Sequence, residues 1–208
     1  MSADLTAKKG LLIVVSGPAG SGKGTVLGEL LKEQDYRYSV SATTRAPRPG
    51  EVDGVNYHFL SRAEFERRIG AGEMLEYTEY CGNYYGTPKK EAEAVLSAGC
   101  NLLLEIEVEG AANVKKEYPQ AVLIMLLPPS FAVQEARLRG RGTETEAKIL
   151  ERLSRTREEV PCVINYDYVV YNHDGRVADT ADDIRAIVRA ERAAVKRNAD
   201  AAANYFAD

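Results

Sequence analysis

The stretch SGPAGSGKGT, residues 16–25, decides the fold, because it joins an apolar run to a segment with helical periodicity. The run LLIVV at 11–15 predicts a strand that is buried on both faces. The segment after the stretch places the apolar residues of 26–31 on one face of a helix. Glycines between a strand and a helix let backbone N–H groups converge on an anion, and the helix N-terminus adds partial positive charge. The sequence therefore predicts a phosphate-binding loop.

The loop departs from the usual pattern at one position. Gly17, Gly22 and Lys23 satisfy G-x-x-x-x-G-K, but Gly24 stands where Ser or Thr normally holds magnesium, and Thr25 follows one residue late. The sequence GKGT resembles the loop of adenylate kinases, which bind nucleotide with Gly after the lysine; the metal then relies more on water, acidic side chains and the phosphates. The predicted ATP-binding residues here are Gly17, Gly20, Ser21, Gly22, Lys23, Gly24 and Thr25.

Composition narrows the function classes. A chain of 208 residues with 45% hydrophobic content predicts one domain with a sizeable core. The net charge of −4 gives no general affinity for nucleic acid or an anionic membrane, and the longest apolar runs are too short to span a bilayer. Cys81, Cys100 and Cys162 are odd in number and widely spaced, which favours a reducing cytoplasm over a disulfide framework or a zinc site.

Short apolar runs beginning at 101, 121 and 166 predict further buried strands, and their alternation with helical patterns indicates an α/β domain. Capping-box spacing predicts helix starts at Ser61 and Thr143. Thr87 before a proline predicts another helix start, with its end at Gly99. Segment 36–85 has short alternating pieces and Gly/Pro turns, and an arginine-rich excursion begins at Arg137.

Five further segments, taken in chain order, closely resemble guanylate kinases: SVSATTRAPRPGEVDGVNY (39–57), EYTEYCGNYYGT (76–87), LLLEIEVEGA (102–111), LLPPS (126–130) and RLRGRGTETEAKILERL (137–153). The resemblance runs from about 11 to 172. It implies a P-loop kinase with a parallel sheet core flanked by helices, a small mixed β/α insertion for the acceptor nucleotide and a helical lid. The expected single domain, 1–208, divides into core (10–35, 99–136 and 160–208), GMP-binding insertion (36–86) and lid (137–159).

The resemblance implies transfer of the γ-phosphoryl group of ATP to GMP, giving ADP and GDP, with Mg²⁺ as Mg-ATP. The acceptor phosphate would be held by arginine forks and tyrosine hydroxyls. A carboxylate can accept both guanine donors, N1–H and the exocyclic amine, while hydroxyls donate towards O6; adenine would leave that carboxylate unpaired. The residues expected to bind GMP are Ser41, Arg45, Arg48, Tyr57, Glu76, Tyr85, Thr87 and Glu107.

On the donor side, the lid arginines would close over ATP and neutralise the charge that develops during transfer. The expected catalytic residues are Lys23, Arg137, Arg141 and Arg152, with Asn172 near the adenine. Acidic residues at i and i+2 share one side of a strand. The family usually has aspartates where this chain has Glu105 and Glu107. Thr25 and Glu105 are the candidate metal ligands.

Two other functions fit parts of the pattern. Guanylate-kinase-like scaffold modules bind phosphorylated peptides but have typically lost the phosphate loop and the lid arginines, both kept here, so only Gly24 favours that hypothesis. A ribose bisphosphate phosphokinase would share the loop and lid but not the acceptor set. The expected partners are ATP, GMP and dGMP, without nucleic acid or membrane, for a cytoplasmic monomer or homodimer.

Overall fold

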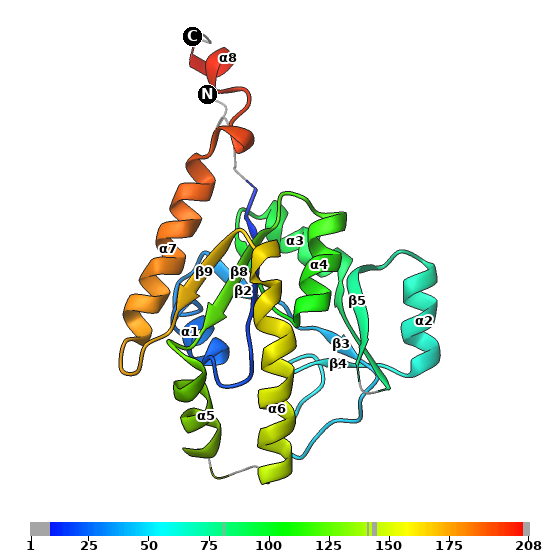
Figure 1. Ribbon diagram of the computed structural model, residues 1–208. Coiled ribbons are helices and arrows are strands. Elements are labelled where there is room, and N and C mark those ends of the chain that lie inside the picture. Colours follow the sequence, from blue (N-terminus) through cyan, green and yellow to red (C-terminus); the bar gives the residue numbers. More distant parts are fainter. Residues whose placement is uncertain (1–8, 81, 141, 143–144, 206–208) are drawn as a thin grey trace.

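A five-stranded parallel sheet forms the centre of the molecule (Figure 1). The computed structural model describes residues 9–80, 82–140, 142 and 145–205. The strand order is β2-β7-β1-β8-β9, and every neighbouring pair runs parallel. The strands are β1 (Leu12–Ser16), β2 (Tyr36–Tyr38), β7 (Asn101–Glu105), β8 (Val122–Leu127) and β9 (Tyr168–Tyr171). The apolar runs predicted as strands at 11, 101, 121 and 166 are confirmed.

Helices cover both faces of this sheet (Figure 1). In β1, Ile13 and Val15 point to one face, where they pack with α1 (Lys23–Leu30) and α7 (Val177–Ala193). Leu12 and Val14 point to the other face, against α3 (Lys89–Ser97) and α4 (Val108–Glu117). Burial on both faces explains why the strand is apolar throughout rather than alternating.

A second, four-stranded mixed sheet of order β4-β3-β6-β5 lies beside the first (Figure 1). Its elements are β3 (Ala42–Thr43), β4 (His58–Phe59), α2 (Arg62–Gly70), β5 (Met74–Tyr80) and β6 (Asn83–Pro88). Ser61 caps α2 by accepting the Glu64 N–H, as the capping-box spacing predicts. The sheet begins at Ala42, whereas 36–38, the expected start of the insertion, pairs with β7 in the large sheet.

Two further helices flank the phosphate loop: α5 (Phe131–Gly140) and α6 (Glu146–Glu159). Leu138, Ile149 and Leu153 join them in a small cluster that also contacts Ala19 of the loop. Thr145 caps α6 by accepting the Lys148 N–H. The cap was expected at Thr143, which lies outside the described residues.

The chain continues through η1 (Val160–Asn165) to β9 and α7, and ends its described part with η2 (Val195–Arg197) and α8 (Ala201–Tyr205). Among the residues that the structure describes, no helix combines the length and the apolar composition needed to cross a bilayer.

Candidate active site

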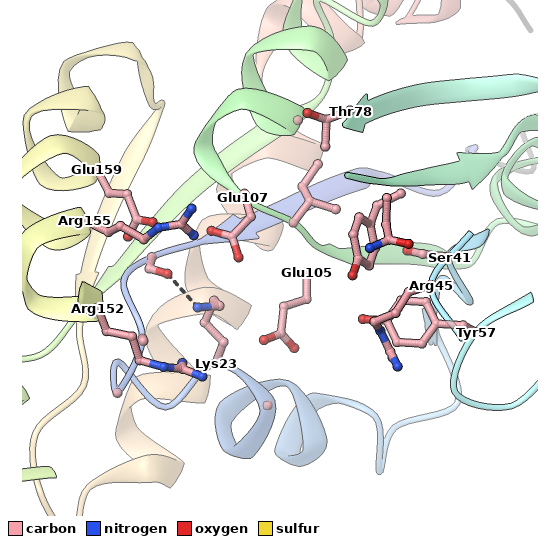
Figure 2. Close-up of a pocket in the computed structure, with 18 of the residues that line it drawn as sticks. Lys23, Ser41, Arg45, Tyr57, Thr78, Glu105, Glu107, Arg152, Arg155 and Glu159 are labelled. Atoms are coloured by element: carbon pink, nitrogen blue, oxygen red, sulfur yellow. Dashed lines mark hydrogen bonds between the residues drawn. The ribbon is translucent and has the colours of Figure 1, made fainter. Parts of the chain in front are cut away.

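One cleft of about 930 Å³ brings together the loop after β1, the small sheet and α6. Figure 2 shows Arg152 and Arg155 approaching from α6, while Arg45 and Tyr57 lie on the opposite side of Lys23 and Glu105. Of the expected site residues, the cleft is lined by Gly17, Gly20, Gly22, Lys23, Gly24, Thr25, Ser41, Arg45, Arg48, Tyr57, Glu76, Tyr85, Glu105, Glu107 and Arg152.

The loop has the backbone of an anion cradle. Gly22 adopts φ +90° directly before α1, and a Cβ there would lie 2.3 Å from the Asn172 amide nitrogen. A Cβ at Gly17 would lie 2.1 Å from the Leu126 carbonyl oxygen. Lys23 begins α1 and folds its ammonium group back onto the Gly17 carbonyl at 2.6 Å (Figure 2). Glycine is therefore required at 17 and 22 by contact and conformation.

Gly24 differs from these glycines, because a Cβ built on it meets no atom within 4 Å. The space that a Ser or Thr side chain would occupy at this position is therefore open and is not filled by a neighbouring residue. Thr25, one residue on, is exposed and lines the cleft. Ser21 is fully buried, and its hydroxyl has no hydrogen-bond partner among the described residues. The structure therefore places the Ser21 side chain inside the loop and not on the cleft wall.

Two expected site residues that do not line the main cleft, Arg137 and Asn172, line a second cavity of about 430 Å³. Its wall includes Asn172 and Arg137 together with Gly20, Gly22 and Thr25 of the loop. The Asn172 amide donates to the Ser21 carbonyl at 2.8 Å, so this side chain also braces the loop from behind.

Arg137 is on the outer side of the phosphate loop. Its Nη2 donates to the Asn172 carbonyl and to Asp174 Oδ1, both at 2.7 Å, and its Nη1 reaches the Gly20 carbonyl at 3.3 Å. Arg137 does not line the main cleft in this structure, and its expected catalytic role stays a prediction. Its ion-pair partner Asp174 is a residue to which the sequence assigned no role.

Glu76, the residue expected to read the base, is a buried carboxyl group that is 5% exposed. Burial raises its pKa to about 7, against the opposing effect of hydrogen bonds from Thr87. The Thr87 hydroxyl is fully buried and donates to Glu76 Oε1 at 2.8 Å. In this structure Thr87 therefore contacts the carboxylate and does not line the cleft, and its contact with guanine stays a prediction. It also lies in β6 and does not cap α3, whose N-cap is Pro88.

The expected phosphate clamp is assembled around Arg45. Its guanidinium lies 5.4 Å from the centroid of the Tyr57 ring, and Tyr57 packs edge-on to Tyr85 with centroids 6.1 Å apart. Glu51 was not expected in the site; both of its carboxylate oxygens accept from Arg45 Nη2, each at 2.9 Å, and Oε2 also accepts the Arg48 backbone N–H at 2.7 Å. These donors hold the pKa of Glu51 below its usual range. The carboxylate thus fixes the turn that presents both arginines.

Acidic side chains face Lys23 from two elements. Burial raises the pKa of Glu105, and the nearby charge of Glu107 raises it further. The positive charge of Lys23 acts in the opposite direction. The Tyr38 hydroxyl also hydrogen-bonds Glu105. Glu159, at the end of α6, has its pKa raised by burial and then by Glu107. Tyr38 and Glu159 line the cleft and were not expected there.

The lid side of the cleft consists of α6. Besides the expected Arg152, it contributes Lys148, Glu151, Arg155 and Glu159. Their spacing of three or four residues, which places side chains on one helical face, was a signal available in the sequence. Arg141 lies outside the described residues.

Comparisons with known proteins agree with this geometry. The guanylate kinase family model matches residues 9–191. The guanylate kinase of Halalkalibacterium halodurans is 53% identical over 88% of this chain and 90% of its own length, and that of Clostridioides difficile is 51% identical over 91% and 92%. The crystal structure of guanylate kinase from Anaplasma phagocytophilum superposes with a TM-score of 0.72 at 35% identity, covering 91% of this chain and 89% of that one. Because the family model matches most of the chain and these relatives are about half identical to it over nearly their full lengths, the chain belongs to the guanylate kinase family.

Proposed function

We propose that this chain transfers the γ-phosphoryl group of ATP to GMP through the cleft described above. The observation that carries the proposal is the joining of two anion sites and a base-reading carboxyl in a single cavity. In this proposal Lys23 marks the donor end of the cleft and Arg45 the acceptor end. Phosphoryl transfer needs positioning and charge stabilisation, not a covalent role for the protein, and this arrangement supplies both.

On the acceptor side, ionised Glu76 accepts N1–H and the exocyclic amine of guanine, and Ser41 donates towards O6. Thr87 acts through Glu76, since its hydroxyl is committed to Oε1. The phosphate binds Arg45, Arg48, Tyr57 and Tyr85, and Glu107 contacts the nucleoside. None of the proposed base or phosphate contacts uses the 2′-hydroxyl, so dGMP is a second acceptor.

On the donor side, the loop backbone from 17 to 25 cradles the ATP phosphates. Lys23 turns from the Gly17 carbonyl, its partner in this structure, to the terminal phosphates. Arg152, joined by Arg141 on lid closure, neutralises charge as it develops on the transferring group. Arg137 and Asn172 form the wall beside the adenine, so Arg137 binds ATP from outside the reacting centre.

The residues around Lys23 fit a magnesium ion, which prefers oxygen ligands and keeps several waters. Thr25 and Glu105 both line the cleft, and the open space at Gly24 leaves room for metal-bound water. Bound there, Mg²⁺ would supply charge neutralisation of the ATP phosphates. Glu105 and Glu107 would orient its waters, while Lys23 opposes the rise in the pKa of Glu105 that burial causes.

A coupled assay of ADP release from Mg-ATP, with GMP, dGMP, AMP, CMP and UMP offered in turn, tests the proposal. We expect turnover with GMP and dGMP only. GMP binding without turnover would instead support a binding module with the architecture of a kinase, and turnover with AMP would contradict base reading by Glu76. Lys23→Met provides the control for contaminating kinase, because it removes the ammonium group from the donor site.

A further inference from the structure

A buried polar connection links the phosphate loop to the lid helix. Gln134, in α5, is 1% exposed and uses one amide nitrogen for two contacts. This Nε2 donates to the Ala19 carbonyl of the loop at 2.9 Å and to the Thr156 hydroxyl of α6 at 2.7 Å. Both amide hydrogens are thereby used, and the flipped amide would turn an oxygen towards the Ala19 carbonyl. The orientation of the side chain is therefore fixed by its partners.

The Thr156 hydroxyl extends the connection by one step. It accepts from Gln134 and donates its single hydrogen to the Arg152 carbonyl, one turn earlier, at 3.0 Å. Thr156 is 4% exposed, so water does not compete for either bond. An unpaired buried hydroxyl or amide is costly, which makes this pair directional and hard to rearrange.

The position of these bonds on α6 gives them a consequence for the cleft. Ile149, Leu153 and Thr156 form the buried face of the helix. Arg152 and Arg155 lie on the face that lines the cleft. The Leu138–Ile149–Leu153 cluster holds the two helices together but is apolar and non-directional. The Gln134–Thr156 bond is a buried directional contact between the two helices, whereas the Arg139–Glu146 ion pair that also joins them is exposed to solvent. A buried bond on this face constrains the rotation of α6 about its axis more than an exposed ion pair does.

We propose that Gln134 and Thr156 are positioning residues that fix the orientation of the lid helix, α6, relative to the phosphate loop. This orientation brings Arg152 to the transferring phosphoryl group. The inference rests on the proposed role of Arg152. Neither side chain touches substrate; both act through the helix backbone. Gln134 bonds both the Ala19 carbonyl and Thr156. A loop that rearranges around phosphate therefore moves the side chain that holds α6. Misplacement of a catalytic arginine by a fraction of an ångström costs rate more than it costs binding.

The test compares Thr156→Val, which removes the hydroxyl at constant volume, with Thr156→Ser, which keeps it. Steady-state kcat and KM for both substrates are measured with Mg-ATP and GMP, beside melting temperatures. We expect Thr156→Val to lower kcat ~10-fold with KM for GMP within about twofold, and Thr156→Ser to restore most of kcat. Gln134→Leu, a second route to the same loss, should show the same split. Ile149→Val is the matched control, because it removes one methyl group from the same helix pair without breaking a polar contact.

A double-mutant cycle with Arg152→Ala shows whether Thr156 acts through Arg152, in which case Thr156→Val has no further effect on kcat in that background. Equal kcat for wild type and Thr156→Val, or a valine variant that loses only thermal stability, would overturn the inference. So would equal losses for valine and serine. A wild-type protein without GMP turnover would refute the proposed function instead, and the two failures are thus distinguishable.

Discussion

Acidification should selectively weaken the use of GMP, because Glu76, the carboxyl group proposed to read guanine, has a pKa raised towards neutrality. Burial raises the pKa of Glu76 to about 7, and Thr87 limits the rise. GMP needs the ionised form, which accepts two donors; the protonated form carries a donor of its own. With this pKa of about 7, the ionised fraction of Glu76 is about 0.9 at pH 8 and about 0.1 at pH 6. The kcat/KM for GMP should therefore fall ~10-fold on going from pH 8 to pH 6.

The assay follows kcat/KM for GMP from pH 5.5 to 8.5 at saturating Mg-ATP, in wild type and in Glu76→Gln. The comparison is needed because a phosphate monoester itself ionises near pH 6. That ionisation is common to both proteins, so the ratio of their kcat/KM values isolates Glu76. We expect this ratio to rise through pH 7 and reach a plateau. A ratio independent of pH would refute the reasoning, since it would mean that Glu76 is fully ionised throughout or does not contact the base.

Three further predictions concern the loop and the same carboxyl group. Gly24→Ser should lower the Mg²⁺ concentration needed for half-maximal rate, because a side chain fits there without contact; an unchanged metal titration would show that the existing oxygen ligands suffice. Gly22→Ala should raise KM for ATP and lower the melting temperature, since its Cβ would meet the Asn172 amide at 2.3 Å and the residue has φ +90°; unaltered values of both would contradict the cradle geometry. Glu76→Gln should stabilise the ligand-free protein at pH 8, by about 3 kcal/mol at most, but not at pH 4.5. Because the pKa of Glu76 is raised in the folded protein, its contribution to folding stability is fully present below the pKa of the unfolded state and is lost as the pH rises towards 7. Denaturant unfolding of wild type and variant at pH 4.5 and pH 8 checks the sign.

The sequence was most informative where function requires a fixed local pattern. The strand, glycine loop and helix from 11 to 30 were predicted because apolar runs and glycine spacing are local signals. The Ser61 cap was correct for the same reason. Gly99 does follow the end of α3, with φ +80°.

Contacts between distant segments were what the sequence could not specify. Thr87 offered a hydroxyl that could serve several partners, and only the pairing of β5 with β6 shows that it reaches Glu76. Arg137 could equally face the cleft or, as found, Asp174. Glu51 and Gln134 carry no periodic signal, because each is defined by partners rather than by spacing. Local chemistry was therefore predictable, and the choice among equivalent partners was not.

The separation of the two sheets has a consequence for redesign. The small sheet, with Glu76 and the Arg45 turn, is built from 42–88, a continuous piece of chain, while the phosphate loop belongs to the large sheet. The piece begins soon after β2 and ends at the start of α3. Apart from Ser41, directly before it, and Glu107, which follows β7, the proposed acceptor contacts all come from this segment, which could be exchanged between related kinases while the proposed ATP site stays in place. A library confined to this segment would search for new acceptors without disturbing the donor site.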